Sequence, residues 1–435
     1  MAEASQALAR AGVHDMDQPP ARDRRPLLQM GVTLLSSTLG NVLTVLLTGW
    51  LVRSLGAEAF GRVAILSSAA TALGNVTASG AALYVVRATS VGASGGSGEA
   101  TRRALGAAAL AGQLFAALFT GAGLLLALGQ QEVLGLTEWA LVALALHVIT
   151  ADIHAKNCLI GYQKVLPLSV ATLAGAVLSS LCQFTGARLG GPPGYLAGFA
   201  MGTVLQLLSS RLVLVRVMGR TPPLGLGARW AGIREPAFLR FVLPATLSAS
   251  LVPGSHWCAN AIAAAKAGQY ADVAVLTVAM QFFNLVIFVP TVLNKIVLPR
   301  TIRDYNSRQG LSETRRHALG QAALMFGLSI AAPVLVWAFS GPIQKAYLFS
   351  APEQLWTLYA FCAASAFACA GIPISNYVVS HQKMAFGLLT NVLWAGAYLL
   401  LAWMLPGTAL AVGLALLIAY VLTLAVAVVP LFSQN

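Results

Sequence analysis

The sequence predicts an all-α, polytopic membrane protein of about twelve transmembrane helices arranged as two six-helix lobes. Three observations lead to this fold class. Of 435 residues, 57% are hydrophobic and only 9% are charged, whereas about 25% of the residues in an ordinary soluble domain are charged. Apolar stretches long enough to cross a bilayer recur from Met30 to Pro430, and several short motifs occur once in each half of the chain.

Each predicted span is a stretch of roughly 20 apolar residues, which crosses a hydrocarbon core of about 30 Å as a helix. Residues 1–25 are polar and lack the apolar core of a signal peptide, so we expect a disordered cytoplasmic tail. Residues 26–216 form the predicted first lobe, 217–239 a cytoplasmic connector and 240–435 the second lobe. The predicted spans cover residues 30–52, 62–86, 104–128, 138–155, 165–187, 194–215, 240–263, 272–296, 318–340, 355–379, 386–405 and 408–430.

The formal net charge of +13 reflects where the basic residues lie along the chain. If the N-terminus is cytoplasmic, 22 of the 27 Lys and Arg residues fall in cytoplasmic segments and span ends. This asymmetry follows the positive-inside rule and predicts that both chain ends are cytoplasmic. We therefore interpret the basicity as a topology signal, and we do not expect nucleic acid as a partner.

Three pairs of similar motifs indicate that a six-span unit was duplicated. The segment TRRALGAAAL at 101–110 resembles TRRHALGQAAL at 314–324, and the Gln163-Lys164 pair resembles Gln382-Lys383. A third pair, FGRVAIL and YADVAVL, begins at Phe60 and Tyr270, and the offsets lie between 210 and 219 residues. Six-span copies have the same orientation in the membrane, so two lobes with a cleft between them predict an alternating-access carrier.

Charged residues within the spans are candidates for contact with an anionic substrate, because a charge at that depth costs roughly 2.5 to 3.5 kcal/mol on insertion scales. The basic candidates are Arg87, Lys156, Arg211 and Lys295, although all four also fit snorkelling to the interface. Asp152 lies four residues before Lys156, which predicts an ion pair on one helix face.

Uncharged polar residues in the seventh and eighth spans form a second candidate group, of which Asn260 also fits a helix–helix hydrogen bond. The members of this group are His256, Asn260, Gln281 and Asn284. His147 and His154 are two helical turns apart, too far to share a metal ion, and the five cysteines lack metal-ligand spacing. We expect no metal site and no cofactor.

The segment LVRSLGAEAFGRVAILSSAATALGNVTASG at 51–80 resembles the entry into the second span of Wzx-type polysaccharide flippases. These flippases belong to the multidrug/oligosaccharidyl-lipid/polysaccharide (MOP) exporter superfamily, which also contains the MATE transporters. The GYQK sequence at 161–164 and Pro299 extend the resemblance. Two glycines of this motif, Gly56 and Gly61, also fit a tight turn between two helices, and Arg53 also fits an anchor at the membrane interface.

The resemblance implies a MATE-like fold and a flippase in the bacterial inner membrane. Its substrate would be a polyprenyl-pyrophosphate-linked oligosaccharide, moved from the cytoplasmic to the periplasmic leaflet for exopolysaccharide or O-antigen (lipopolysaccharide) biosynthesis. Membrane lipids and the polysaccharide polymerase and export machinery are the implied partners. A cation-coupled multidrug-type exporter is the main alternative, disfavoured by the scarcity of carboxylates in the spans. A membrane glycosyltransferase or polymerase is less consistent with the short external loops, so we do not expect an enzyme. A non-transporting membrane scaffold also fits the sequence.

Overall fold

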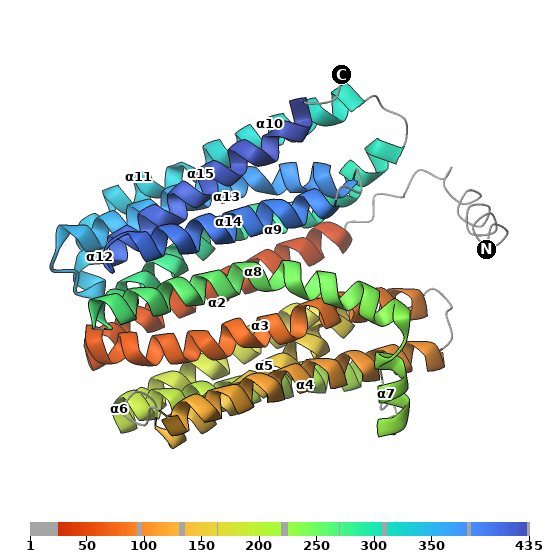
Figure 1. Cartoon of the computed structure of the whole chain (residues 1–435), viewed down its shortest axis with the longest axis horizontal. Helices are drawn as coiled ribbons and strands as arrows, with labels where there is room; N and C mark the ends of the chain where they lie inside the picture. The colour runs from red at the N-terminus through yellow and green to blue at the C-terminus, as the bar shows by residue number, and fades with distance from the viewer. Residues whose placement is uncertain are drawn as a thin grey trace.

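The computed structural model describes residues 25–93, 98–129, 135–162, 164–218, 225–268, 270–306, 311–380 and 384–432. Within these ranges the chain forms α-helices and no β-strand. All of the predicted tail except Arg25 lies outside them. The helices, labelled as in Figure 1, are α2 (Arg25–Leu55), α3 (Ala57–Ala93), α4 (Gly98–Gly129), α5 (Leu136–Gly161), α6 (Val165–Met218), α7 (Leu226–Ile233), α8 (Pro236–Ala267), α9 (Ala271–Asn306), α10 (Leu311–Ser329), α11 (Ala331–Ala338), α12 (Ser340–Tyr347), α13 (Pro352–Ser380), α14 (Met384–Met404) and α15 (Ala409–Phe432).

Within the described residues, 11 helical segments are long and apolar enough to cross a membrane. The segment in α6 has 52 residues, more than twice the length that one crossing needs. It reverses direction at Gly191, whose φ of 59° and ψ of −141° are not helical. The described residues therefore contain helices for twelve spans of a membrane protein, as the sequence predicts, and the fifth and sixth spans are the two arms of α6.

The two arms of α6 pack closely because glycines line the contact between them. A Cβ at Gly186 would collide with the backbone of Gly194, and one at Gly198 would collide with the carbonyl of Cys182. Small residues allow membrane helices to approach until their backbones touch, which gains dispersion energy along the whole contact. Pro192 and Pro193 follow the reversal at Gly191, a position where the missing proline N–H removes no internal helical bond.

The ninth predicted span, 318–340, is interrupted. α10 ends at Ser329 and α11 begins at Ala331. Pro333 lies four residues after Ser329 and has no N–H to donate to the Ser329 carbonyl, so the helical ladder breaks there.

Both described ends of the chain lie at the same end of the helix bundle, as Figure 1 shows. We call this the terminal end; it also holds α7. The opposite end, here the distal end, holds α12 and the reversal in α6. An even number of spans requires this placement of the two ends.

The helix pairs of the first half recur in the second half. α3 packs on α5 as α9 packs on α13, and α2 packs on α6 as α8 packs on α14. α4 packs on α5 as α10 packs on α13. A duplicated six-span unit would give this pattern. The predicted lobe boundaries stay a prediction.

α8 runs between the two groups of helices (Figure 1). Its first turns pack on the first half, because Phe238 and Val242 join a buried cluster with Ala81 and Val85 of α3. The predicted connector is therefore partly structured: it contains α7, and α8 begins at Pro236, four residues before the predicted lobe boundary.

A larger apolar core joins the two halves nearer the distal end. Leu51, Phe60 and Leu196 of the first half belong to the same buried cluster as Leu276 and Phe361 of the second half. The halves are thus held together by apolar packing at the distal end and by α8 at the terminal end.

Topology can be tested by labelling cysteines introduced at the two ends of the bundle, in a variant without the native cysteines. Arg188 near the distal reversal and Glu99 at the start of α4 are both exposed. We expect an impermeant thiol reagent added to intact cells to label Arg188→Cys, and to label Glu99→Cys only after permeabilisation, because the positive-inside rule places the terminal end in the cytoplasm. The reverse pattern would contradict the orientation.

Candidate functional site

A polar face of α3 points toward the second half of the protein. Ser68 and Asn75 follow Gly61 by seven and fourteen residues, so all three lie on one face of the helix. A Cβ at Gly61 would collide with the backbone carbonyl of Tyr270, at the start of α9, so this face meets α9. The opposite face packs on α5, where the Thr77 hydroxyl lies 2.7 Å from another threonine hydroxyl.

Four hydroxyl and amide side chains follow one another along this face of α3. Ser68, Asn75 and Ser79 are half-buried and Thr71 is exposed. Each donates a hydrogen bond to a backbone carbonyl one turn earlier, for example Ser68 to Ile65 at 2.9 Å and Asn75 to Thr71 at 2.8 Å. The three hydroxyl donors and one of the two N–H groups of the Asn75 amide are satisfied within the helix. The side-chain oxygens keep lone pairs that can accept hydrogen bonds from a ligand.

The helices that face α3 carry the same kind of side chain. Gln281 of α9 donates a hydrogen bond from Nε2 to the Thr48 hydroxyl of α2. Asn284, one turn further along α9, is exposed, as is Thr44, one turn before Thr48 on α2. The buried Oε1 atom of Gln281 has no hydrogen-bond partner among the described residues, which leaves an acceptor for a ligand.

We call these side chains the interlobe seam; its members are Thr44, Thr48, Ser68, Thr71, Asn75, Ser79, Gln281 and Asn284. The helices that supply them carry acidic residues only near their ends. α2 contains no acidic residue, and those of α3 and α9 are Glu58, Asp272 and Asp304. The seam can therefore exchange hydrogen bonds with an uncharged polar group but offers no carboxylate to a cation.

The turn between α2 and α3 connects the two halves at the distal end. Glu58 accepts hydrogen bonds from the backbone N–H groups of Tyr270 and Ala271, at distances of 2.8–2.9 Å. Arg53 donates from Nε to the Ala346 carbonyl at 2.9 Å and from Nη2 to the Lys345 carbonyl at 2.7 Å. We call these bonds the distal latch.

The hydrogen bonds of the distal latch, from Glu58 and from Arg53, all satisfy backbone groups that a helix end leaves unpaired. The carboxylate of Glu58 lies at the N-terminus of α9, and the guanidinium of Arg53 lies near the C-terminus of α12. Each charge has the sign that the helix dipole favours. Gly56, with a φ of 81°, gives the turn that places the two side chains. The tight turn that the sequence motif at 51–80 allows is thus present. The structure shows in addition that Arg53 and Glu58 of this turn contact the second half.

The basic candidates predicted from sequence have different partners. Lys156 lies 2.7 Å from Asp152, which confirms the ion pair that the spacing predicted. Arg211 is exposed on α6 and lies within electrostatic range of His154 and Cys158 of α5. Arg87 lies in α3 and Lys295 in α9, and their side chains are outside the described part.

The uncharged candidates divide between the seam and the interior of the second half. Gln281 and Asn284 belong to the seam, whereas His256 lies among aromatic rings of α9 and α14. Asn260, one turn after His256 on α8, is half-buried. The prediction missed the α3 residues of the seam, although the seven-residue spacing of Ser68 and Asn75 was a readable signal.

His147 and His154 form hydrogen bonds within the first half. His147 Nδ1 lies 2.7 Å from Gln113 Oε1, and its Nε2 lies 3.2 Å from the Thr120 hydroxyl. His154 Nδ1 lies 2.7 Å from the Thr150 carbonyl. No group of three or more His, Cys, Asp and Glu side chains suited to a metal occurs within the described ranges.

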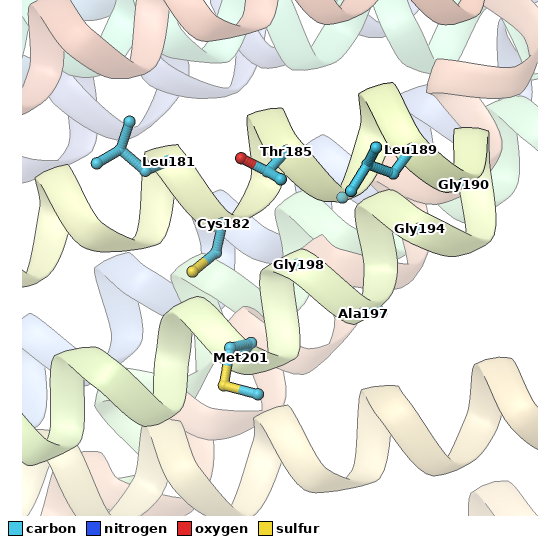
Figure 2. A pocket seen from close by; sticks show the side chains of 10 residues that line it. Leu181, Cys182, Thr185, Leu189, Gly190, Gly194, Ala197, Gly198 and Met201 are labelled. Atoms are coloured by element: carbon cyan, nitrogen blue, oxygen red, sulfur yellow. The ribbon is translucent and has the colours of Figure 1, made fainter.

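A groove between the two arms of α6 has a volume of about 590 Å³ (Figure 2). Leu181 and Cys182 line one arm and Ala197 and Met201 the other. Thr185 is the one hydroxyl among these lining residues. The groove therefore suits an apolar chain and lacks the hydrogen-bonding groups of the seam.

No protein-family model and no curated protein sequence matches this chain. Solved structures do match it. One is a multidrug-resistance MATE family transporter of the MOP superfamily in an inward-facing conformation, with a TM-score of 0.68, 15% identity and coverage of 90% of this chain and 94% of that one. Another is the lipid II flippase MurJ in an inward closed conformation, with a TM-score of 0.65, 14% identity and coverage of 92% and 87%.

A third similar structure is a MOP superfamily transporter from Pyrococcus furiosus with a binding pocket of reverse polarity, with a TM-score of 0.62, 15% identity and coverage of 93% and 94%. These similarities cover nearly the whole chain. The protein therefore has the fold of MOP superfamily transporters, a class that contains both multidrug transporters and a lipid flippase.

Removing the Glu58 carboxylate should weaken closure at the distal end. A capping interaction contributes about 1 kcal/mol, so Glu58→Ala should raise the population open at this end about fivefold. The reporter is a cysteine in the seam, Thr71→Cys, in a variant without native cysteines. The measured quantity is the rate at which this cysteine reacts with an impermeant thiol reagent added on the distal side. Glu138→Ala is the control, because it breaks an ion pair with Arg62 inside the first half. Equal rates in both variants would contradict the distal latch.

Lys156 should act on stability, because its ammonium group compensates a buried carboxylate. The Asp152 side chain is 8% exposed, and Lys156→Gln should lower the free energy of unfolding by about 2 kcal/mol. Thermal unfolding of the purified protein measures the loss, and Asp152→Asn combined with Lys156→Gln should recover most of it.

The control for this pair is Glu99→Gln, which breaks an exposed ion pair of the same spacing with Arg103 and should cost less than about 0.5 kcal/mol. A stability loss for Lys156→Gln no larger than the loss for Glu99→Gln would show that the Asp152 pair contributes nothing.

Proposed function

We propose that the protein is an inner-membrane flippase for polyprenyl-pyrophosphate-linked oligosaccharides, moving them from the cytoplasmic to the periplasmic leaflet. The observation that carries the proposal is the interlobe seam, in which hydroxyl and amide groups face one another between two halves of a transporter fold. Oligosaccharides present many hydroxyl groups, so such a surface matches their chemistry.

In this proposal the polyprenyl tail of the substrate stays in the lipid bilayer, whereas its saccharide contacts the seam between the two halves. Leu35, Leu39 and Leu46 of α2 are 62%, 48% and 66% exposed, and by helical spacing they lie on the face opposite Thr44 and Thr48. That apolar face suits contact with lipid and with a polyprenyl chain. The saccharide would pass along the polar faces while the tail stays in the bilayer.

The membrane potential supports movement of the pyrophosphate in this direction. A cytoplasm-negative potential contributes about 2.3 kcal/mol per charge per 100 mV to the export of an anion. Export of the head group is therefore electrically downhill, and the desolvation of its polar groups is the main barrier that the protein must lower. The seam would lower this barrier by replacing part of the hydration of the saccharide.

A multidrug-type exporter is the second candidate, because MATE transporters have the same fold. Cationic drugs favour carboxylates, which α2 and α8 lack and which α3 and α9 carry only near their ends. The Pyrococcus furiosus transporter, whose reversed pocket polarity suggests a different function, supports the use of pocket chemistry to separate functions within this fold.

A lipid-flipping assay in reconstituted vesicles tests the proposal. Asn75→Ala should slow translocation of a lipid-linked oligosaccharide about fivefold, because one lost hydrogen bond costs about 1 kcal/mol. Asn157→Ala is a matched control: both asparagines donate to the carbonyl one turn earlier at 2.8 Å, but Asn157 lies on α5. A wild-type protein that exports cationic drugs and does not flip the lipid-linked sugar would contradict the proposal.

A further inference from the structure

The groove between the two arms of α6 has the depth of one membrane leaflet. Figure 2 shows Leu189 and Gly190 at one end of the groove and Leu181 and Met201 at the other. From Leu181 to Gly190 the first arm advances nine residues, which is about 14 Å of helix. Half of a hydrocarbon core is about 15 Å thick. Because the reversal at Gly191 lies at the distal end, the groove spans the hydrocarbon part of the distal leaflet.

The groove is closed toward the protein and open toward lipid. Its floor is the contact between the arms, where a Cβ at Gly186 would collide with the carbonyl of Gly194. Leu181, Leu189 and Met201 line it and are exposed. Its volume of about 590 Å³ lies within the range of about 300–1,000 Å³ that is typical of ligand sites. A hydrocarbon chain along the groove therefore contacts both arms and cannot pass between them into the interior.

A cation lies at the distal end of this groove. Arg188 directly precedes Leu189 and follows Leu181 by seven residues, so it lies on the face of the first arm that lines the groove. The side chain is exposed, and α6 contains no acidic residue in its 54 residues. Glu138, at the distal start of α5, is paired with Arg62. The guanidinium of Arg188 therefore has no carboxylate partner among the described residues.

Basic residues are scarce at the distal end, so one without a protein partner is informative. The predicted topology places only five of the 27 Lys and Arg residues outside. Three of these five bind carbonyl or carboxylate oxygens of the protein, namely Arg53, Arg62 and Lys266. The side chains of the other two, Arg188 and Lys345, have no such partner within the described ranges, and of these only Arg188 adjoins the groove.

We propose that this groove binds one anionic phospholipid of the distal leaflet, of the phosphatidylglycerol type. One acyl chain lies along the groove, and the phosphate accepts a charge-assisted hydrogen bond from Arg188. The hydroxyl of Thr185, three residues before Arg188 and part of the lining, lies at the depth of the glycerol ester groups.

A phospholipid suits this site better than the transported lipid does. The groove opens toward the bilayer on the outer side of α6, whereas the interlobe seam lies between the two halves. Its occupant is therefore drawn from the abundant lipids of the surrounding leaflet and does not have to leave during a transport cycle. The inference goes beyond the proposed function and does not depend on it.

Native mass spectrometry of the purified protein measures the contribution of the charge. The wild type should hold one phosphatidylglycerol molecule about fivefold more tightly than phosphatidylcholine with the same acyl chains, because a basic side chain near the membrane surface attracts an anionic lipid by about that factor. Arg188→Gln should abolish this preference. Lys345→Gln is the matched control, because it removes the other unpartnered distal cation, and it should keep the preference.

Filling the groove tests the position of the acyl chain. Ala197 lines the groove and is exposed, so the ring of Ala197→Phe occupies the groove without entering the core. This variant should lose the tightly held lipid. Ala174→Phe, the same substitution at an exposed residue of α6 outside the lining, should retain it. Thermal unfolding shows whether each variant is folded, and if Ala197→Phe is not, the surface substitution Arg188→Gln decides alone.

Equal retention of phosphatidylglycerol and phosphatidylcholine by the wild type would overturn the proposal. Retention that is unchanged in Arg188→Gln, or in a folded Ala197→Phe, would do the same. Glycerol phosphate, the head group without chains, should not displace the bound lipid, and displacement would show that the groove contributes nothing. A polyprenyl phosphate that binds where phosphatidylglycerol does not would assign the groove to the transported lipid and exclude the phospholipid.

Discussion

The bond between Glu58 and the start of α9 is the interaction on which the arrangement of the two halves depends. It joins a side chain of the first half to backbone N–H groups more than 200 residues away. Arg53, in the same turn, binds the carbonyls near the end of α12. Because both partners are backbone groups at helix ends, separation of the halves exposes unpaired polar groups, which water must then satisfy. In the proposed alternating-access cycle, the distal end would alternate between a state closed by these bonds and a state open to water.

This constraint explains why the space between the halves can remain polar. Closure at the distal end and packing of α8 on α3 hold the halves in place, so the seam does not need to pack tightly. The seam side chains of α3 donate hydrogen bonds within their own helix, as Ser68 and Asn75 do, and Gln281 donates to Thr48 within the seam. The cost of placing them at bilayer depth is thereby small. Because the seam groups are uncharged, they would bind a substrate by hydrogen bonds alone and without strong electrostatic attraction. In the proposed function this favours release of the substrate as well as binding.

Hydropathy predicted the helices well, because the requirement for apolar length acts locally on each span. The reversal within α6 was predicted for the same reason, from the apolar length on both sides of Gly191. The Asp152–Lys156 pair was predictable because its partners are one turn apart on a single helix. The roles of Glu58 and Arg53 were not, since their partners are backbone atoms brought near by the fold. Ser68, Thr71 and Ser79 were missed because hydroxyl residues that bond to their own helix change the hydropathy little.

A reversible cross-link across the distal end tests most directly whether this end opens during transport. Glu58 and Tyr270 are in contact in the closed state, so Glu58→Cys with Tyr270→Cys, in a background without native cysteines, should form a disulfide under oxidation. Opening of the distal end requires these residues to separate. Oxidised protein should therefore lose transport in the vesicle assay and regain it after reduction, while each single variant is unaffected by oxidation. Transport at the same rate before and after reduction would show that the substrate crosses without opening the distal end.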